Sequence, residues 1–491
     1  MKYFLTLIQL WVGFLSICAS YPKANIWIIP SVESPQVYRN YAQTSKVHLE
    51  MARGEVEHIQ LVFPSKVNEE YRFTFDRYLK GIQISARELK KMNGYYDALV
   101  PFKNQLKCTD TLTAVWITVQ CPSRVPVGKY HQTIKIEGSK HFTIQLDYNV
   151  HHTTIPLKSS IPITVGVENR CMTECLNDKE ADKERQRWVD FVLSYRMTPV
   201  FGTQITPERW QYEHSFSPWA WNDKRSIRLL NDRRYSCYML PFFTLSENEL
   251  ASLLCNIQKK GKLKESLFYI WDEPAYMEDY EQIKRKVNII RKYASDARIL
   301  TTFFCGPRNG PRKGDLYAVF DYLKHHIHVA TISLAPCKGN EEEVQHIRYK
   351  VPEGIDWWSY VCWQPGGNEP NFLLQMKGIQ QRAIMWRTWK NGSQGFLYWN
   401  CNIYHKRNPF TYITDMPHGD GILIYPGDIL GCKGPIASAR LERWRDGAEE
   451  MELLRLVEKN YSKEKADTLL NIVYSSPLSF IEKAHNIPFF R

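Results

Sequence analysis

The sequence predicts a chain in two parts, an N-terminal β-sandwich followed by a (β/α)8 barrel of the TIM type. With 491 residues, the chain is long enough for more than one domain. Up to about Pro156, short β-prone runs are separated by turn residues, which is typical of an all-β domain. After Pro156, short apolar runs alternate with amphipathic stretches, which is typical of repeated βα units. The predicted fold class is therefore multidomain, β plus α/β.

Residues 1–20 have the features of a secretory signal peptide. Lys2 precedes an apolar stretch over residues 3–17, and the small residues Ala19 and Ser20 follow it. We expect cleavage after Ser20 and a secreted or periplasmic location. The apolar stretch is short for a membrane span and no later stretch approaches its length, so no transmembrane segment is expected.

Residues 21–156 are predicted to form the sandwich. Three of its strands, at 57–63, 115–119 and 130–136, are rich in β-branched and aromatic residues. Turn signals such as Val127-Gly128-Lys129 separate runs of this kind at intervals of about a dozen residues. This domain is expected to support the second domain or to position substrate.

Residues 157–460 are predicted to form the barrel, and as the second domain they are expected to be the catalytic one if the protein is an enzyme. Amphipathic stretches at 178–195, 246–260 and 276–293 have apolar residues at spacings of three and four, as helices do. Between such stretches lie eight candidate strands, the number that a (β/α)8 barrel needs. The candidates are 161–167, 198–202, 238–243, 267–271, 299–304, 329–334, 357–362 and 395–399.

The segment 435–460 is predicted to form the last helix of the barrel domain. Between residues 440 and 452 its charges alternate in sign, and ion pairs between neighbouring side chains on an exposed helix explain most of that pattern. Residues 461–491 are expected to form a C-terminal tail with one further helix.

Charge and cysteine usage argue against two classes of partner. The formal net charge is +12, from 64 basic and 52 acidic residues, but no basic motif has the spacing of a nucleic-acid site. Cys171 and Cys175 have no second pair with ligand spacing, so no metal is expected. The twelve cysteines permit disulfides in an exported protein without requiring them. Sequons begin at Asn391 and Asn460, and they matter only if the source organism glycosylates proteins.

Two adjacent acids mark the candidate catalytic site. Asp272 and Glu273 follow a β-prone run, and Pro274, which has no backbone N–H, ends the predicted strand. The acids therefore lie at the C-terminal tip of the fourth predicted strand. In a parallel barrel this end carries the catalytic residues. The competing interpretation is an ordinary turn with solvated acids, because Asp is common in turns.

Four motifs occur in order around the predicted barrel. They are Tyr269-Ile270-Trp271-Asp272-Glu273-Pro274, Gly395-Phe396-Leu397-Tyr398-Trp399, Gly419-Asp420-Gly421 with Tyr425-Pro426-Gly427, and Arg440-Leu441-Glu442 with Arg445-Asp446-Gly447. Together they resemble glycoside hydrolase family 123 over most of the mature chain. The resemblance implies an exo-acting β-N-acetylgalactosaminidase with a sandwich before its barrel. It also implies a glycan or glycolipid substrate with terminal β-linked N-acetylgalactosamine, and no cofactor.

The same resemblance implies a retaining, substrate-assisted mechanism. The 2-acetamido oxygen of the substrate attacks the anomeric carbon and gives an oxazolinium intermediate, so no protein nucleophile is needed. Asp272 then orients the acetamido group and stabilises its positive charge, while Glu273 acts first as acid and then as base.

The position of both acids on one strand sets a geometric condition. Successive side chains of a strand point to opposite faces, so the backbone has to turn between or just after Asp272 and Glu273 for both to reach one pocket. Pro274 gives a reason for that turn. The same alternation predicts Tyr269 and Trp271 on the face of Glu273.

Aromatic and polar residues near other predicted strand tips complete the expected site. Tyr360 is expected to donate a hydrogen bond to the acetamido carbonyl, by analogy with a tyrosine of family 20 hexosaminidases. Asp420 is a candidate for binding sugar hydroxyls, although a glycine-flanked Asp is also an ordinary turn. Trp386 lies on a predicted helix, where core packing explains it equally well. The expected substrate-binding residues are Trp271, Tyr360, Trp363, Trp386, Tyr398, Trp399, Asn400 and Asp420.

Two other functions stay open at this level. A retaining glycosidase acting on a sugar without an acetamido group needs a separate carboxylate roughly 5 Å from Glu273 as nucleophile. A non-catalytic carbohydrate-binding protein on the same barrel is the other alternative, because a fold alone does not establish activity.

Overall fold

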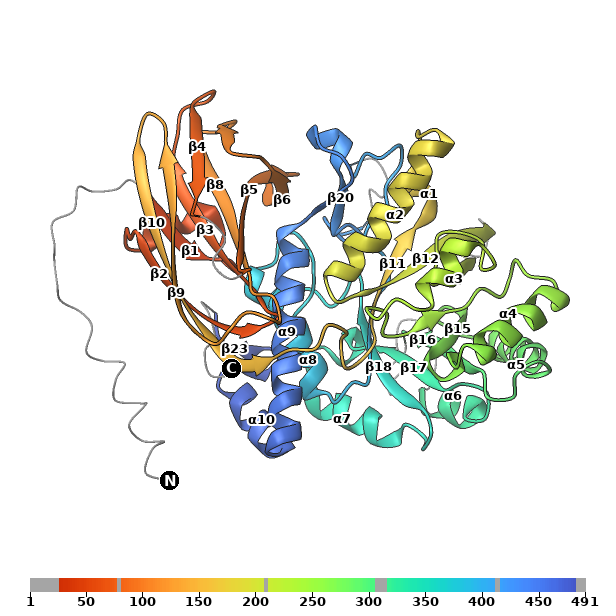
Figure 1. The fold of residues 1–491 in the computed structure, drawn as a ribbon. Helices are drawn as coiled ribbons and strands as arrows, with labels where there is room; N and C mark the ends of the chain where they lie inside the picture. Colours follow the sequence, from red (N-terminus) through yellow and green to blue (C-terminus); the bar gives the residue numbers. More distant parts are fainter. Residues whose placement is uncertain (1–25, 77–80, 207–210, 305–315, 411–415, 483–491) are drawn as a thin grey trace.

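The computed structural model of this protein describes residues 26–76, 81–206, 211–304, 316–410 and 416–482. It contains an N-terminal β-sandwich and a barrel surrounded by helices, which lie side by side (Figure 1). The predicted fold class is therefore confirmed. The predicted signal peptide, residues 1–20, lies outside the described residues.

Two five-stranded sheets form the sandwich. Their facing side chains, among them Leu61, Val115, Ile134 and Leu146, are buried and make its core. The predicted strands at 57–63, 115–119 and 130–136 correspond to β3, β8 and β9. In spatial order, one sheet consists of β1 (Trp27–Pro30), β3 (Val56–Pro64), β8 (Leu112–Gln120), β5 (Gln83–Met92) and β6 (Tyr95–Pro101). The other consists of β2 (Lys46–Arg53), β10 (His141–Thr154), β9 (Gly128–Glu137), β4 (Glu70–Phe75) and β7 (Gln105–Lys107).

All eight strands predicted for the barrel are present, and each runs parallel to its neighbours. In spatial order they are β12 (Thr198–Thr206), β11 (Ile163–Glu168), β19 (Phe396–Tyr398), β18 (Asp356–Val361), β17 (Val329–Ser333), β16 (Arg298–Phe303), β15 (Ser266–Trp271) and β14 (Tyr238–Met239). Their carboxyl ends therefore meet at one end of the barrel.

A ninth strand, β13 (Gln211–Ser215), was not predicted. It pairs antiparallel with β12. In the described part of the chain no strand pairing joins β12 to the short β14, so the ring is not closed by parallel pairing alone. The N–H of Phe216, just after β13, donates to the carbonyl of Met239 in β14 at 2.6 Å. The hairpin of β12 and β13 thus fills the gap in the barrel wall.

Helices cover the outside of the barrel (Figure 1). In α4, Ser246 and Glu249 form a capping box, and Leu250, Leu254 and Ile257 are buried at helical spacing. The helices that follow barrel strands are α1 (Asn169–Thr173), α2 (Asp178–Ser194), α3 (Lys224–Leu229), α4 (Glu247–Lys259), α5 (Met277–Arg291), α6 (Leu316–Leu323), α7 (Glu341–Lys350) and α8 (Gly378–Lys390).

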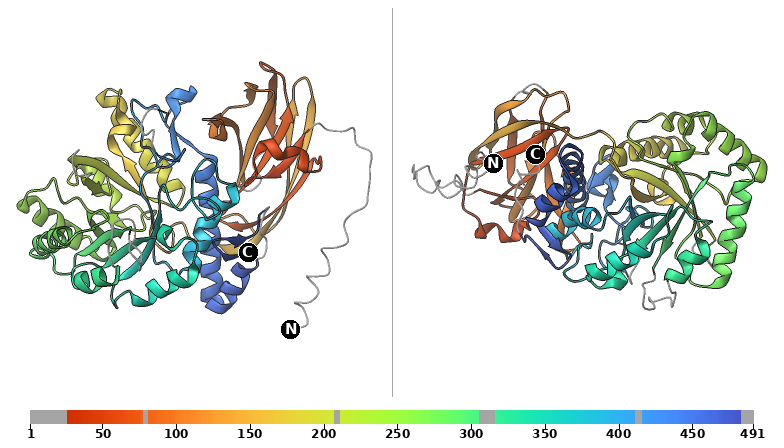
Figure 2. Two further views of the ribbon diagram at one scale, coloured as in Figure 1. Left: turned by 180° about the vertical axis from the view of Figure 1, so that it is seen from behind. Right: turned by 90° about the horizontal axis from the view of Figure 1, so that it is seen from below.

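Helix α9 (Ala439–Asn460) is buried, which corrects the expectation of an exposed helix. Every residue from Ala439 to Leu454 is buried, and the helix runs between the sandwich and the barrel (Figure 1, Figure 2). Arg440 pairs with Asp97 of β6 at 2.9 Å, and Arg382 of α8 donates to Glu450 at 2.5 Å. The charges of α9 are therefore matched largely by distant segments of both domains.

The described part of the predicted tail, residues 461–482, packs into the barrel domain. It contains α10 (Lys463–Asn471) and the hairpin of β22 (Tyr474–Ser476) and β23 (Ser479–Phe480). Leu470 and Tyr474 belong to the same buried cluster as the barrel core. A second small hairpin, β20 (Ile424–Pro426) and β21 (Pro435–Ala437), precedes α9 and packs against β6 of the sandwich.

Candidate active site

The backbone turns sharply at the tip of β15. The strand ends at Trp271, as Pro274 predicted, and Glu273 has a positive φ of 45°. A proline disfavours the right-handed helical region for the residue before it, which favours an unusual conformation here. The turn directs both Asp272 and Glu273 into one cavity, as the geometric condition requires.

A β-bulge in β15 changes the expected alternation of side chains. Tyr269 pairs with Leu300 of β16, but Trp271 pairs with the next residue, Thr301, so Ile270 is the extra residue of the bulge. As a result, the Tyr269 hydroxyl donates to Asp272 Oδ1 at 2.8 Å. The prediction that Tyr269 accompanies Glu273 is therefore corrected.

Asp272 is held by hydroxyl groups. Besides Tyr269, Thr302 of β16 donates from Oγ1 to Asp272 Oδ1 at 2.7 Å. The same Oγ1 accepts the backbone N–H of Glu273 at 2.9 Å. Thr302 thus fixes the carboxylate of one acid and the backbone of the other.

His214 of β13 supports Tyr269. The two rings stack nearly parallel, with centroids 4.3 Å apart and an angle of 8° between the planes. Burial lowers the pKa of His214 to about 4, against the opposing effect of Asp272, so the ring is neutral at neutral pH. Tyr212 and Gln211 of the same strand also line the cavity. None of these three residues was predicted from the sequence, because their place at the site depends on residues 211–215 forming a strand beside the barrel mouth.

Glu273 is bonded to Tyr360 of β18. The Tyr360 hydroxyl donates to Glu273 Oε1 at 2.5 Å. Burial, reinforced by the negative charge of Glu273, raises the pKa of Tyr360 well above its ordinary value, so the phenol stays protonated as a donor. Tyr360 was expected to donate to the acetamido carbonyl of a substrate, and in this structure its hydroxyl donates to the catalytic candidate Glu273.

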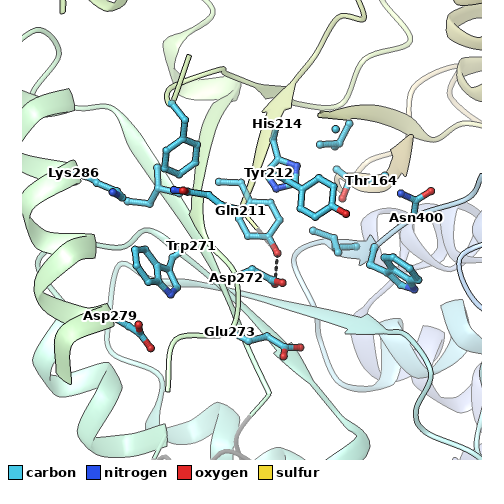
Figure 3. A pocket seen from close by; sticks show the side chains of 18 of the residues that line it. Thr164, Gln211, Tyr212, His214, Trp271, Asp272, Glu273, Asp279, Lys286 and Asn400 are labelled. Carbon is cyan, nitrogen blue, oxygen red and sulfur yellow. Dashed lines mark hydrogen bonds between the residues drawn. The ribbon is translucent and has the colours of Figure 1, made fainter. Parts of the chain in front are cut away.

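The acids open into a cavity of about 1170 Å³. Its walls come from β11, β12, β13, β15, α5 and β19, and Figure 3 shows the side chains around the acids. Of the expected substrate-binding residues, Trp271, Tyr398, Trp399 and Asn400 line it. The cavity lies at the carboxyl ends of the parallel strands, where active sites of such barrels occur.

Asp420 lies behind Tyr398 and Trp399. Its Oδ1 accepts from the Tyr398 hydroxyl and from Trp399 Nε1, both at 3.0 Å, while Oδ2 has no hydrogen-bond partner among the described residues. Asp420 is 4% exposed, and burial raises its pKa to about 6. Asp420 thus orients the Tyr398 ring at the end of β19 and the Trp399 ring just after the strand.

Besides Tyr360 and Asp420, two more expected binding residues, Trp386 and Trp363, do not line the cavity. Trp386 is fully buried on α8, and its Nε1 donates to Glu450 of α9 at 2.8 Å. The core-packing alternative therefore accounts for Trp386, and its expected substrate role is corrected. Trp363 follows β18 and is 44% exposed, with its ring stacked on Phe304 at 6.2 Å.

The structure also shows the surroundings of the two sequons and of the cysteines. Asn391 is completely buried, so its sequon is not accessible in the folded chain, whereas Asn460 is exposed. The ten cysteines in the described ranges are free thiols. The same ranges hold no group of three or more His, Cys, Asp or Glu side chains arranged for a metal ion. No helix within them combines the length and apolar character needed to cross a membrane.

Comparisons with known proteins agree with this geometry. The family model described as glycoside hydrolase 123, catalytic domain, matches residues 183–457, more than half of the chain. The structure is similar to that of a family 123 glycoside hydrolase from Clostridium perfringens, analysed for the details of glycolipid glycan hydrolysis. The TM-score is 0.66 and the identity 14%, over 91% of each chain.

More distant similarity extends to other glycosidases. A GH2 β-galacturonidase from Eisenbergiella tayi matches with TM-score 0.35 and 9% identity, over 81% of this chain and 89% of that one. An FMN-binding β-glucuronidase from Facaelibacterium prausnitzii matches with TM-score 0.32 and 10% identity, over 82% and 59%. None of the curated proteins matches.

Proposed function

Because this chain belongs to glycoside hydrolase family 123, we propose that it is an exo-acting β-N-acetylgalactosaminidase with a retaining, substrate-assisted mechanism. The observation that carries the proposal is the pair of adjacent carboxylates, Asp272 and Glu273, at the tip of one barrel strand and in one cavity. The two acids have different hydrogen-bond partners, which suits two different roles.

In the first proposed step Glu273 donates its proton to the glycosidic oxygen as the bond to the anomeric carbon breaks. The acetamido oxygen of the substrate attacks that carbon from the opposite face and forms the oxazolinium ion. The carboxylate of Asp272, held in place by Tyr269 and Thr302, faces the positive charge that develops on the acetamido nitrogen.

In the second step Glu273, now ionised, removes a proton from water. The oxygen of that water attacks the anomeric carbon and opens the oxazolinium ring, which restores the acetamido group and the protonated acid. Tyr360 stabilises the ionised form of Glu273 through its hydrogen bond, and it is free to bond the acetamido group when Glu273 is protonated.

The arrangement of the remaining acids favours this mechanism over a protein nucleophile. Glu168 of β11 and Asp420 lie near the same end of the barrel, but both are buried and neither lines the cavity. Asp279 and Glu278 do line it. The carboxylate of Asp279 accepts the backbone N–H groups of Ala275 and Tyr276 at the start of α5. Glu278, in the first turn of the same helix, is exposed to solvent.

The substrate class and location complete the proposal. The substrate is a glycan or glycolipid with terminal β-linked N-acetylgalactosamine, in line with the glycolipid glycans of the similar Clostridium perfringens enzyme. Export rests on the sequence of residues 1–20 alone.

A panel of chromogenic β-glycosides tests the function. We expect cleavage of the 2-acetamido galactoside and strong inhibition by a thiazoline mimic of the oxazolinium ion. Cleavage restricted to glycosides without an acetamido group would instead indicate a retaining glycosidase with a protein nucleophile. Binding of the same sugars without any cleavage would favour a carbohydrate-binding protein.

A further inference from the structure

The cavity extends to both sides of the acid pair. In Figure 3 the carboxyl groups of Asp272 and Glu273 point toward the side of Thr164 and Asn400, whereas Trp271 and Lys286 lie on the opposite side. The volume of about 1170 Å³ is above the usual range of about 300–1000 Å³ for the pocket of a drug-sized ligand. A terminal sugar on the Asn400 side therefore leaves room near Trp271 for the part of the substrate that departs.

Lys286 of α5 brings a cation to the Trp271 side. Its Nζ lies 5.6 Å from the centroid of the Trp271 ring and 5.4 Å from that of Phe243, and all three residues line the cavity. The faces of aromatic rings attract an ammonium group. The two rings thus hold the ammonium group of the half-buried Lys286 at the cavity wall.

This cation has no counter-charge among the described residues: no carboxylate oxygen lies within ion-pair distance of Nζ. Burial lowers the pKa of Lys286, and no carboxylate in the described ranges acts to raise it again. The acids of the helix do not compensate. Glu281, the nearest in sequence, pairs with Lys284 at 3.8 Å. Asp279 caps the first turn of α5 and lies across the Trp271 ring in Figure 3, and Glu278 is exposed. A partly desolvated, unpaired cation gains free energy from an anionic ligand.

We propose that Lys286 binds an anionic group, a carboxylate or a sulfate ester, on the leaving part of the substrate. The Trp271 ring packs against the sugar that carries this group. The inference rests on the proposed function, because the leaving part is defined by the bond that Glu273 protonates. It goes further by making the enzyme selective for acidic glycans at the position next to the terminal N-acetylgalactosamine.

The test measures kcat/KM for three disaccharides, in which N-acetylgalactosamine is β-linked to glucose, to glucuronic acid or to 6-sulfated glucose. Glucose and glucuronic acid differ only where a hydroxymethyl group replaces a carboxylate. We expect the wild type to favour at least one acidic disaccharide, and the two acidic disaccharides distinguish carboxylate from sulfate recognition.

Lys286→Met should reduce kcat/KM on the favoured acidic substrate roughly tenfold to hundredfold and change kcat/KM on the neutral one about twofold or less. Lys286→Arg should keep the preference.

Lys284→Met is the matched control. Lys284 lies on the same helix but pairs with Glu281 at 3.8 Å and packs over Tyr322, outside the cavity lining. This variant should leave the three rates unchanged, and thermal unfolding of each variant checks that it is folded.

Three outcomes would overturn the inference. The wild type could treat acidic and neutral disaccharides alike, or Lys286→Met could slow all three equally, which would make Lys286 only a support for Trp271. A fourth disaccharide, in which the terminal N-acetylgalactosamine carries the sulfate and glucose is the leaving sugar, is measured as well, and a loss in Lys286→Met confined to this substrate would place the cation on the wrong side. Wild-type hydrolysis of the aryl β-N-acetylgalactosaminide is measured in parallel. Its absence counts against the proposed function, whereas its presence without discrimination counts only against Lys286.

Discussion

Glu273 combines a strained backbone with two fixed contacts. A φ of +45° lies in the left-handed region, which costs an L-residue about 1–2 kcal/mol. The backbone bond to Thr302 and the side-chain bond from Tyr360 hold the residue in that conformation. The sequence predicted a turn from Pro274, but it did not predict these contacts, because they depend on how β16 and β18 align beside β15.

Glu273→Gln tests the proton transfer. The amide cannot donate a proton to the glycosidic oxygen, so kcat/KM on substrates with poor leaving groups should fall roughly a hundredfold to ten-thousandfold. Aryl glycosides with good leaving groups should lose less, because they need less protonation. Glu265→Gln, at the opposite end of β15, is the control and should behave as wild type. Normal rates for Glu273→Gln on a poor leaving group would remove this residue from the mechanism.

Asp420→Asn tests whether ionisation of the buried Asp420 makes the stability of the protein depend on pH. Burial raises the pKa of Asp420 from an ordinary 3.8 to about 6. Because the folded pKa is the higher one, this stabilising contribution is complete below about pH 4 and is lost as pH rises through 6. Ionising Asp420 should therefore cost the wild type about 3 kcal/mol of unfolding free energy between these limits.

Asparagine keeps an oxygen that accepts from Tyr398 and Trp399, but it does not ionise. As pH rises, the unfolding free energy of the variant relative to that of the wild type should therefore increase by that amount. Urea unfolding of both proteins at several pH values between 4 and 8 measures the difference. A pH-independent difference would contradict the assignment.

Among the elements, β15 shows what a sequence pattern can and cannot predict. Its position, its end at Trp271 and the acids at its tip follow from β-prone residues and Pro274. The bulge at Ile270 does not, because a bulge is defined by register against a partner strand. For the same reason, Tyr269 was assigned to Glu273 rather than to Asp272.

Helix α9 shows a second limit. Alternating charges fit an exposed helix with neighbouring ion pairs, and they equally fit a buried helix whose partners come from elsewhere in the chain. The partners here are remote in sequence, as with Asp97 for Arg440 and Arg196 for Glu449. Only the folded structure distinguishes the two cases.

Arg440→Met should destabilise the protein by about 3–5 kcal/mol, because it leaves the buried carboxylate of Asp97 without its cation. The change also removes donors to the carbonyls of Phe372 and Gly419. Arg455→Met on the same helix is the control, since the Arg455–Glu458 pair is partly exposed and its loss should cost roughly 1 kcal/mol. Guanidinium chloride unfolding measures the loss of unfolding free energy in both variants. Equal losses would contradict the idea that a buried ion pair matters more than a partly exposed one.

At the scale of the whole molecule, the eight barrel strands were predictable because each is a short apolar run between amphipathic helices. The closure of the barrel was not, since β13 is short, polar and stabilised by pairing with β12. That strand brings His214 to the site, so the unpredicted part of the fold and the missed site residues have one cause.

The position of α9 between the domains predicts that sandwich and barrel unfold together. Arg440 and Arg443 bond groups of the sandwich segment, at Asp97 and at the carbonyl of Ser31, while Glu450 bonds Arg382 of the barrel. Separating the domains would expose or unpair these charges, so neither domain is expected to persist without the other.

Calorimetry should therefore show one transition, with calorimetric and van't Hoff enthalpies in agreement, although chains of this length often unfold in several steps. Arg440→Met should move that single transition to lower temperature without dividing it. Two resolved transitions, of which the substitution shifts only one, would mean that the domains are independent and that α9 belongs to the barrel alone.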